Sequence, residues 1–318
     1  MLFWRQLGLL IFALGFTAFV LGAACTPSSS TSAAPPTTEF DQQRAWNDLT
    51  AQVKFGYRIP GTKTHMKTRD WLAAQLKAST TAVTLQPFHH HRVGEKDVAM
   101  WNIVADFTGT GAAPREKVLL CAHWDSRPFS DHDPDPAKRK TPIDGADDGA
   151  SGVAVLLEIA RQLKAQPIAR DVEIVLFDGE DFGPGIEDML LGSQYYANQL
   201  SAAKPSWGIL LDMIGYKDLT IYREPTSEKA APKVNDRVFY AARALGYLRT
   251  GDFIGFVDAP YPYDITDDHT PLNKAGVPTV DLIDFDYPPW HTTGDTIEQC
   301  SAEALKVVGK TVLLAIQE

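Results

Sequence analysis

The chain has 318 residues, of which 44% are hydrophobic and 22% are charged, so it can bury a full core in one large or two ordinary domains. A balance of 30 Lys and Arg against 40 Asp and Glu gives a net charge of −10, and no basic run is longer than residues 138–140. Because neutralising phosphates needs clustered cations, this composition argues against nucleic-acid binding. The 7 Trp and 15 Phe argue against disorder, and 3 Cys are too few for a disulfide scaffold.

The N-terminus has the features of an export signal. An apolar run over residues 7–24 follows Arg5 and ends in small residues directly before Cys25. This ending resembles a bacterial lipoprotein signal, in which the cysteine is lipidated and becomes the first residue. We therefore expect a signal peptide at 1–24, and a lipidated Cys25 with a flexible Ser/Thr/Pro stalk at 25–40. The protein would then be periplasmic or on the cell surface, with the lipid as its only membrane attachment. A cleaved soluble protein and a retained membrane helix are the alternatives.

Residues 41–318 are expected to form the remaining, catalytic domain, in which helical and strand patterns alternate. In chain order, we expect helices at 41–55 and 66–78, strands at 80–88, 102–107 and 117–122, a helix at 151–164, a strand at 171–177, a helix at 193–200, a strand at 207–214, a helix at 234–245, a strand at 279–285 and a helix at 302–317. Short apolar strands between helices predict a single α/β domain, whose central sheet is largely parallel or mixed and carries helices on both faces.

Acidic residues and histidines cluster directly after the predicted strands, where open α/β sheets place their sites. Those that follow or end strands, or lie in nearby loops, include His123, Asp125, Asp147, Asp148, Asp178, Glu180, Asp181, Asp212, Asp267, Asp268, His269 and His291. Any one of them alone is more simply explained as a helix cap or a hydrogen-bonded side chain. Their recurrence favours a shared site, and such a pool of carboxylates and imidazoles is costly unless a cation lies among them.

Mixed His and carboxylate ligation suits zinc, which in catalytic sites has three protein ligands and an open position. The adjacent acids Glu180 and Asp181 are informative, because neighbouring side chains point in different directions. One acid of this pair can hold a metal ion while the other faces a reacting group.

In their order and spacing, several short motifs resemble the zinc aminopeptidase clan. They are H-x-D-S from His123, G-A-x-D-x-A-S-G from Gly145, D-G-E-D from Asp178, L-L-D ending at Asp212 and W-H-T from Trp290, with R-x-P-G-T from Arg58. The resemblance covers about residues 41–318 and is closest to the glutaminyl-peptide cyclotransferase branch of the clan. It implies the aminopeptidase-like α/β fold.

The clan contains two chemistries that differ in their metal sets. The cyclotransferase branch uses one zinc ion, which the resemblance assigns to Asp148, Asp181 and His291. The aminopeptidases hold two zinc ions, and the additional ligands would be His123 and Asp212. Both ligand sets are present, so a two-zinc aminopeptidase is the alternative function. An inactive binding lipoprotein that retained the fold is the alternative from another class.

Three features favour the cyclotransferase branch. Trp290 precedes His291, and the stretch over residues 182–191 is longer than the link typical of aminopeptidases. The sequence around H-W-D-S-R and L-L-D-M-I-G also resembles that of bacterial cyclotransferases. Trp290 is expected to form one wall of a glutamine pocket. The tryptophan that animal enzymes carry after the acid pair is missing from residues 182–206, and Phe182 is the candidate for the second wall.

The reaction implied by the resemblance is cyclisation of the N-terminal Gln of peptides and proteins to pyroglutamate, with release of ammonia. Glu180 would move the proton from the attacking amine to the leaving group. Asp212 and Asp267 would help to keep a shared proton at Glu180 through like-charge repulsion. Asp125 would orient local structure.

The lipoprotein hypothesis is tested by labelling. Cells expressing the chain and fed a radiolabelled fatty acid should incorporate label into the protein, and Cys25→Ala should abolish incorporation, because the thiol is the acylation site. An unlabelled wild-type protein that still begins at Met1 contradicts the hypothesis.

Overall fold

The computed structural model describes residues 39–92, 96–249, 251 and 254–318. The expected signal peptide, Cys25 and nearly all of the stalk lie outside these residues, and no described helix is long and apolar enough to span a membrane. The described helices are α1 (Gln42–Phe55), α2 (Lys63–Lys77), α3 (Ala150–Ala165), α4 (Leu191–Gln199), α5 (Pro225–Ala230), α6 (Pro232–Ala244), α7 (His269–Lys274) and α8 (Ala302–Ala315), with 3₁₀ turns at Ile186–Asp188 and Ile297–Gln299. The strands are β1 (Val83–His90), β2 (Val98–Phe107), β3 (Lys117–His123), β4 (Asp171–Phe177), β5 (Trp207–Asp212), β6 (Thr220–Arg223), β7 (Gly255–Pro260) and β8 (Thr279–Ile283).

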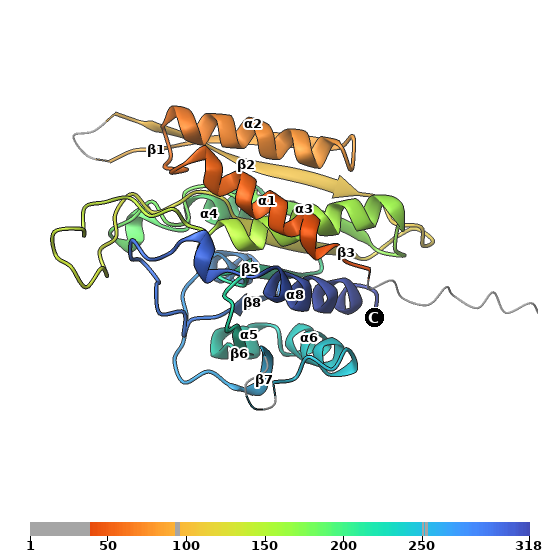
Figure 1. The fold of residues 1–318 in the computed structure, drawn as a ribbon. Helices are drawn as coiled ribbons and strands as arrows, with labels where there is room; N and C mark the ends of the chain where they lie inside the picture. The colour runs from red at the N-terminus through yellow and green to blue at the C-terminus, as the bar shows by residue number, and fades with distance from the viewer. Residues whose placement is uncertain (1–38, 93–95, 250, 252–253) are drawn as a thin grey trace, which may run out of the picture. The chain divides into compact units, whose positions relative to one another are not determined.

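A six-stranded mixed sheet in the order β1-β2-β4-β3-β5-β8 forms the centre of the described domain (Figure 1). β1, β2 and β4 pair antiparallel, whereas β4, β3, β5 and β8 pair parallel. The four parallel strands therefore deliver their carboxyl ends to one edge, where the loops that carry the polar motifs begin.

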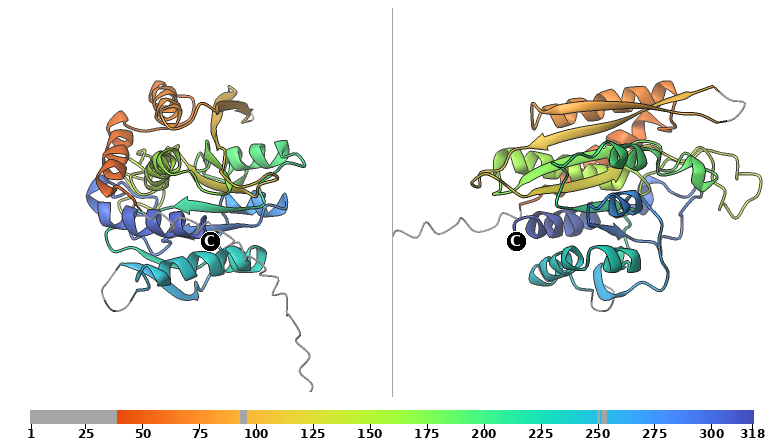
Figure 2. Two further views of the ribbon diagram at one scale, coloured as in Figure 1. Left: turned by 90° about the vertical axis from the view of Figure 1, so that its right-hand side faces the viewer. Right: turned by 180° about the vertical axis from the view of Figure 1, so that it is seen from behind.

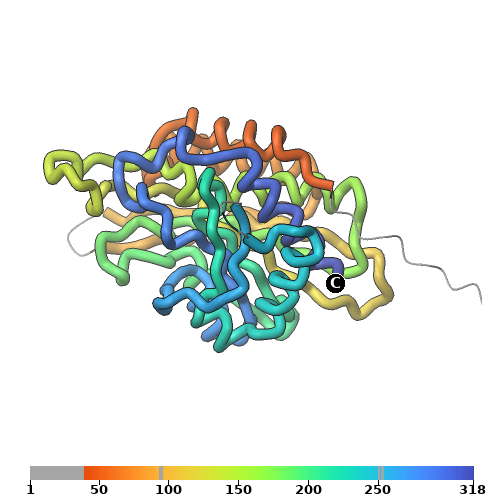
Figure 3. The backbone as a smooth tube through the Cα atoms, turned by 60° about the horizontal axis from the view of Figure 1, so that its bottom comes forward, coloured from red at the N-terminus to blue at the C-terminus, as the bar shows by residue number. Residues whose placement is uncertain are grey.

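Helices cover both faces of the sheet (Figure 2). Alternating side chains of the buried strands pack against the helices on opposite faces. On β3, Leu120 packs with α1, α3 and α8 in the larger core, whereas Leu119 and Cys121 pack with α4 and α7 on the other face. α1 and α8 lie side by side although they come from opposite ends of the described chain (Figure 3). The predicted single α/β domain with helices on both faces is confirmed.

The sequence prediction missed four short elements, namely β6, β7, α5 and α7. β6 and β7 form a separate two-stranded parallel sheet, and each of the four elements is only 4 to 6 residues long. β6 and β7 are only partly buried and lack the continuous apolar run that marks β5. α5 and α7 have six residues each, less than two helical turns, so they show no helical period. The strand expected at 207–214 ends at Asp212, because Met213 takes a left-handed conformation with φ 45°.

Cys121 and Cys300 are both buried free thiols. Cys121 lies within β3, as expected for a small hydrophobic residue. No disulfide therefore joins these two described cysteines.

Arg58 connects the segment after β3 to the loop before α3. Its guanidinium is fully buried and donates to three carbonyl oxygens, those of Trp124 at 2.9 Å, Asp144 at 2.8 Å and Gly145 at 2.7 Å. Its backbone N–H donates to Ser126 Oγ at 3.0 Å. These bonds hold together the two segments from which the candidate site is built.

Replacing Arg58 should destabilise the fold. Arg58→Met leaves the carbonyl oxygens of Trp124 and Asp144 without their donor, whereas Gly145 O keeps the N–H of Ala150. Each acceptor that stays buried costs about 1–3 kcal/mol, so we expect a loss of about 2 kcal/mol or more in the free energy of unfolding. Urea unfolding measures it. Arg243→Met is the control, because the Arg243 side chain is 64% exposed where it pairs with Asp258, and such a pair contributes about 0–1 kcal/mol. Equal effects of the two substitutions would contradict the role given to Arg58.

Candidate metal centre

Three of the predicted zinc ligands converge at the carboxyl edge of the sheet, although they come from distant segments. Asp148 lies in the loop that leads into α3, Asp181 lies in the turn after β4, and His291 lies in the loop after β8. His291 Nε2 is 3.7 Å from Asp148 Oδ2 and 3.5 Å from Asp181 Oδ1. One ligand atom from each residue lies within 4.8 Å of the others.

This cluster fits a metal ion by its burial and its donor atoms. Asp148, Asp181 and His291 are 3%, 1% and 6% exposed, and Asp181 Oδ2 has no hydrogen-bond partner. A buried carboxylate oxygen without a partner is costly unless a cation or a donor faces it. Two carboxylates and an imidazole form a donor set that zinc accepts.

The two additional aminopeptidase ligands lie next to this cluster. His123 Nε2 is 3.1 Å from Asp148 Oδ1 and 3.2 Å from Asp212 Oδ1, so these three residues form a second group that could hold a metal ion. His123 Nδ1 lies 3.4 Å from Asp125 Oδ1. Burial lowers the pKa of His123, whereas the carboxylates of Asp212, Asp125 and Asp148 raise it. The net effect raises this pKa well above its usual value.

The backbone is strained at two points beside the site. His291 and Met213, which follows Asp212, have positive φ angles of 53° and 45°, a conformation that is uncommon for residues other than glycine. Gly149, next to Asp148, has φ 96°, and a Cβ atom there would lie 2.6 Å from the carbonyl oxygen of Asp125. Glycine is therefore required at position 149.

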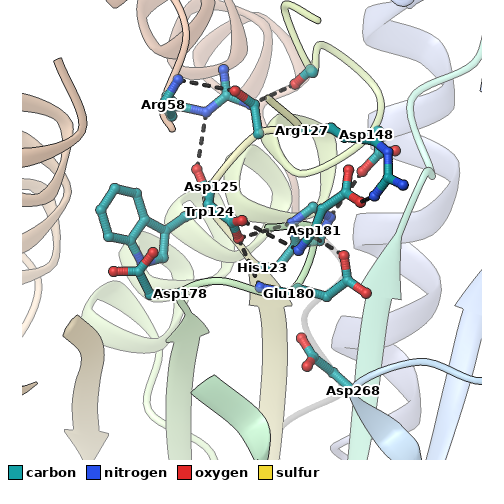
Figure 4. A network of polar contacts seen from close by, with 12 residues as sticks. Arg58, His123, Trp124, Asp125, Arg127, Asp148, Asp178, Glu180, Asp181 and Asp268 are labelled. Atoms are coloured by element: carbon teal, nitrogen blue, oxygen red, sulfur yellow. Dashed lines mark hydrogen bonds and ion pairs between the residues drawn. The ribbon is translucent and has the colours of Figure 1, made fainter. Parts of the chain in front are cut away.

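Two further carboxylates fix the ligand-bearing loops by accepting backbone N–H groups. Asp125 accepts from Glu180 N at 3.1 Å and from Asp181 N at 3.2 Å (Figure 4). Asp295 accepts from Asp147 N at 2.9 Å and from Asp148 N at 3.3 Å. Both side chains are fully buried. The sequence indicated an orienting role for Asp125, but the role of Asp295 was missed because no motif marks it.

Arg127 is a second residue that sequence reasoning missed. Its guanidinium pairs with Asp181 (Figure 4). It also donates to both carboxylate oxygens of Asp131, each at 2.8 Å. It thus places a fixed positive charge against one predicted zinc ligand. Its position in the H-W-D-S-R segment was the available signal, since a basic residue beside metal ligands offsets their charge.

Glu180 is buried at the site but belongs to neither group that could hold the metal there. Burial is the main cause that raises the pKa of its carboxyl well above the usual value, and the charges of Asp181 and Asp267 act in the same direction, whereas His123 lowers it. His123 Nδ1 lies 4.0 Å from Glu180 Oε2. Glu180 therefore holds a proton more readily than an ordinary exposed carboxyl.

A pocket of about 210 Å³ opens over these residues. Its lining combines Asp148, Glu180, Asp212, Asp264, Thr266, Asp267 and His291 with the apolar side chains of Met189, Met213, Ile265, Ile283, Phe285 and Trp290. The ring centroids of Trp290 and His291 are 4.1 Å apart, and those of Trp290 and Phe285 are 4.8 Å apart. Aromatic side chains thus lie directly beside the residues that could bind a metal ion.

Phe182 does not line this pocket, so its expected place as the second wall is corrected. It packs with Phe88 and Met100 in a separate cluster, and the guanidinium of Arg92 lies 4.0 Å above its ring. Phe285 stands beside Trp290 instead. The sequence could not separate these positions, because the side-chain direction in the turn after β4 depends on packing.

Residues 102–316 match the model of Peptidase family M28. This chain belongs to that family. The match spans the parallel strands and every residue of the cluster, and members of this zinc-dependent family have the mixed sheet flanked by helices seen here.

Solved structures of both chemistries resemble the chain over nearly their full length. Glutaminyl cyclase from Porphyromonas gingivalis is 39% identical with a TM-score of 0.80, and the similarity covers 87% of this chain and 98% of that one. Glutaminyl cyclase from Bacteroides thetaiotaomicron is 35% identical with a TM-score of 0.81, over 88% and 98%. A Zn-dependent exopeptidase from Parabacteroides distasonis is 37% identical with a TM-score of 0.81, over 88% and 99%.

The curated relatives divide in the same way. Aminopeptidase YwaD of Bacillus subtilis is 31% identical over 63% of this chain, and the match spans only 40% of that protein. The glutaminyl-peptide cyclotransferase-like protein of Bos taurus is 27% identical over 81% of this chain and 70% of its own length. The family is therefore clear, whereas the choice between its two chemistries depends on the site.

The ligand assignment of the pocket predicts different effects of two substitutions. Asp181→Ala should remove one bound zinc ion per chain, since it deletes one of three protein ligands. His123→Ala should leave the zinc content unchanged if the pocket holds a single ion. Elemental analysis of the purified variants measures both. A loss of zinc on His123→Ala would indicate the two-zinc arrangement.

Proposed function

We propose that the chain is a zinc-dependent glutaminyl-peptide cyclotransferase that acts on the N-terminal Gln of peptides and proteins. The observation that carries the proposal is the aromatic pocket of about 210 Å³ in which Trp290 lies against His291 and Glu180 lines the same space. A small, partly apolar pocket can hold one substrate side chain. Its polar residues can then contact the amide group of that side chain.

Asp148, Asp181 and His291 would hold the zinc ion, which when bound supplies Lewis-acid polarisation of the γ-carboxamide. Arg127 and Asp125 keep Asp181 in place, through its carboxylate and its backbone N–H respectively. The geometry of the ligand set is therefore fixed before substrate enters.

Glu180 would be the proton carrier. The α-amine of the substrate attacks the carbonyl carbon (Cδ) of its own γ-carboxamide, the new C–N bond closes the ring, and the bond from Cδ to the amide nitrogen breaks so that this nitrogen leaves as ammonia. Glu180 accepts the proton that the amine loses and returns it to the leaving nitrogen, so no external water or base is consumed. Its buried carboxyl with a raised pKa suits both transfers. Asp212 and Asp267, which also line the pocket, would keep that proton shared at Glu180.

A two-zinc aminopeptidase is the second candidate, and one observation favours it. His123, Asp148 and Asp212 form a group able to hold a second ion beside the first. Two ions would serve to activate a water molecule for hydrolysis, a step that cyclisation does not require because the substrate supplies its own nucleophile.

We also propose that the enzyme is exported and lipid-anchored through Cys25, as the signal-like residues 1–24 indicate. An extracytoplasmic position would bring it into contact with secreted peptides and proteins.

The experiment is a mass assay on peptides that begin with Gln. Cyclisation lowers the mass by about 17 daltons through loss of ammonia, whereas an aminopeptidase releases free amino acids. Glu180→Gln should retain zinc and fold while turnover falls by about 10²–10⁴-fold, mostly in kcat, because it removes general acid–base catalysis and leaves the pocket intact. The control Glu187→Gln changes a carboxyl outside the pocket lining and should behave as wild type.

The outcomes separate the hypotheses. Release of free amino acids with no mass loss of the intact peptide supports the aminopeptidase. Near-full cyclisation by Glu180→Gln contradicts the proton-carrier role, and release of zinc by Glu180→Gln but not by Asp181→Ala means that the roles within the acid pair are reversed.

A further inference from the structure

A second buried cluster, distinct from the ligand set in the pocket, lies on the face of the sheet covered by α5 and α7. It consists of Asp267, His269 at the start of α7 and Asp281 on β8, and one ligand atom of each lies within 4.8 Å of the others. Their exposed fractions are 3%, 0% and 1%. Asp267 and His269 belong to the D-D-H segment noted in the sequence.

Polar atoms in this cluster lack partners. Both oxygens of Asp281, Oδ2 of Asp267 and Nδ1 of His269 are buried without a hydrogen bond. His269 Nδ1 is 3.6 Å from Asp281 Oδ2. Among the described residues, no Lys or Arg forms an ion pair with Asp267 or Asp281. Buried carboxylates of this kind need a cation or a proton close by.

The hydrogen bonds of His269 fix which ring nitrogen faces the carboxylate. Glu224 accepts hydrogen bonds from the backbone N–H groups of Thr226 and Ser227. Burial alone would raise the pKa of the Glu224 carboxyl, but the hydrogen bonds that it accepts, above all the one from the Thr226 hydroxyl, lower this pKa below its usual value. The Thr226 hydroxyl therefore donates to Glu224 Oε2 at 2.7 Å, and its oxygen, 2.6 Å from His269 Nε2, accepts the ring N–H. Because Nε2 is the donor, Nδ1 is the ring nitrogen that faces Asp281, and it has no hydrogen-bond partner.

Nδ1 of His269 lies 3.6 Å from Asp281 Oδ2, and a cation between these two atoms would contact both of them. This is the arrangement of a metal-bound histidine, whose other ring nitrogen donates to a protein acceptor that fixes the tautomer. Tetrahedral zinc with N and O ligands at about 2.0–2.2 Å separates its ligand atoms by about 3.4 Å. The observed 3.6 Å between His269 Nδ1 and Asp281 Oδ2 is close to that separation.

We propose that Asp267, His269 and Asp281 bind a second, structural divalent transition-metal ion of the zinc class. A nitrogen ligand with two carboxylates disfavours Mg²⁺ and Ca²⁺, which take oxygen ligands. The ion would join α7 to β8 and fix the loop whose residues Thr266 and Asp267 line the pocket. Asp267 would then belong to both sites, and the bound ion would offset its repulsion of Glu180, which leaves that role to Asp212. The zinc content expected of the wild type rests on the proposed function, in which the pocket holds one ion.

Metal content by substitution tests the proposal. The full chain is incubated with ZnCl₂, and unbound zinc is removed by gel filtration. The number of zinc ions per chain is then measured by elemental mass spectrometry. The wild type should carry one ion in the pocket and one at the buried cluster. His269→Gln and Asp281→Asn should each lose one ion, Asp181→Ala should lose the other, and the Asp181→Ala/Asp281→Asn variant should lose both.

Asp264→Asn is the matched control, because it removes an acid from the same loop whose side chain is 61% exposed and paired with Lys229. It should keep the wild-type zinc content. The proposal is overturned if His269→Gln and Asp281→Asn also keep it, or if the second ion is lost on His123→Ala instead, which would assign it to the pocket.

The histidine orientation gives a finer readout. Thr226→Val leaves all three ligands in place but removes the acceptor of the His269 ring N–H, so zinc affinity at this cluster should fall by about 10- to 100-fold. An unchanged affinity contradicts the role of Thr226.

If these variants do not fold, crystals of the wild-type protein test whether the cluster binds a metal ion. An anomalous difference map at the zinc edge should show a peak between His269 Nδ1 and Asp281, separate from the peak at Asp148, Asp181 and His291. A map without that peak, with protons or water satisfying the acids, overturns the proposal.

Discussion

The structure depends on how it accommodates buried carboxylates at the carboxyl ends of four parallel strands. Asp148, Asp181 and Asp212 are all less than a tenth exposed there, and several more acids lie nearby. Removing such groups from water is unfavourable without compensating donors or charge. Arg127 and the two histidines of the pocket supply part of that compensation, and a metal ion among the remaining oxygens would supply more.

The acids divide by what they face. Asp125 and Asp295 face backbone N–H groups and accept hydrogen bonds that hold the loops. Asp148 and Asp181 face each other and His291, so they can share a cation. Glu180 faces the pocket outside the metal-binding groups there, which leaves its carboxyl free to carry a proton. A single chemical group thus accepts structural hydrogen bonds at some positions, and under the proposed function it would serve as metal ligand or proton carrier at others.

This arrangement is compatible with either activity named among the relatives. The ligands that a second ion would need, His123 and Asp212, lie in place beside the first set. What surrounds the ion then determines the reaction, because attack by a bound water and attack by the substrate's own amine require different space. Here the pocket walls are Trp290, Phe285 and other apolar side chains, which limit the room above the cluster.

The sequence by itself determined the α/β class, most of the elements and the residues that converge, because strand and helix periods are local and motif spacing follows the chain. It missed β6 and β7, which are only partly buried and lack a continuous apolar run, and α5 and α7, which are shorter than two helical turns. Only the tertiary structure decided that Phe285 rather than Phe182 stands beside Trp290, that Arg127 pairs with Asp181, and that Thr226 fixes the His269 ring. Those facts depend on side-chain direction and on contacts between segments far apart in the chain, which no local pattern encodes.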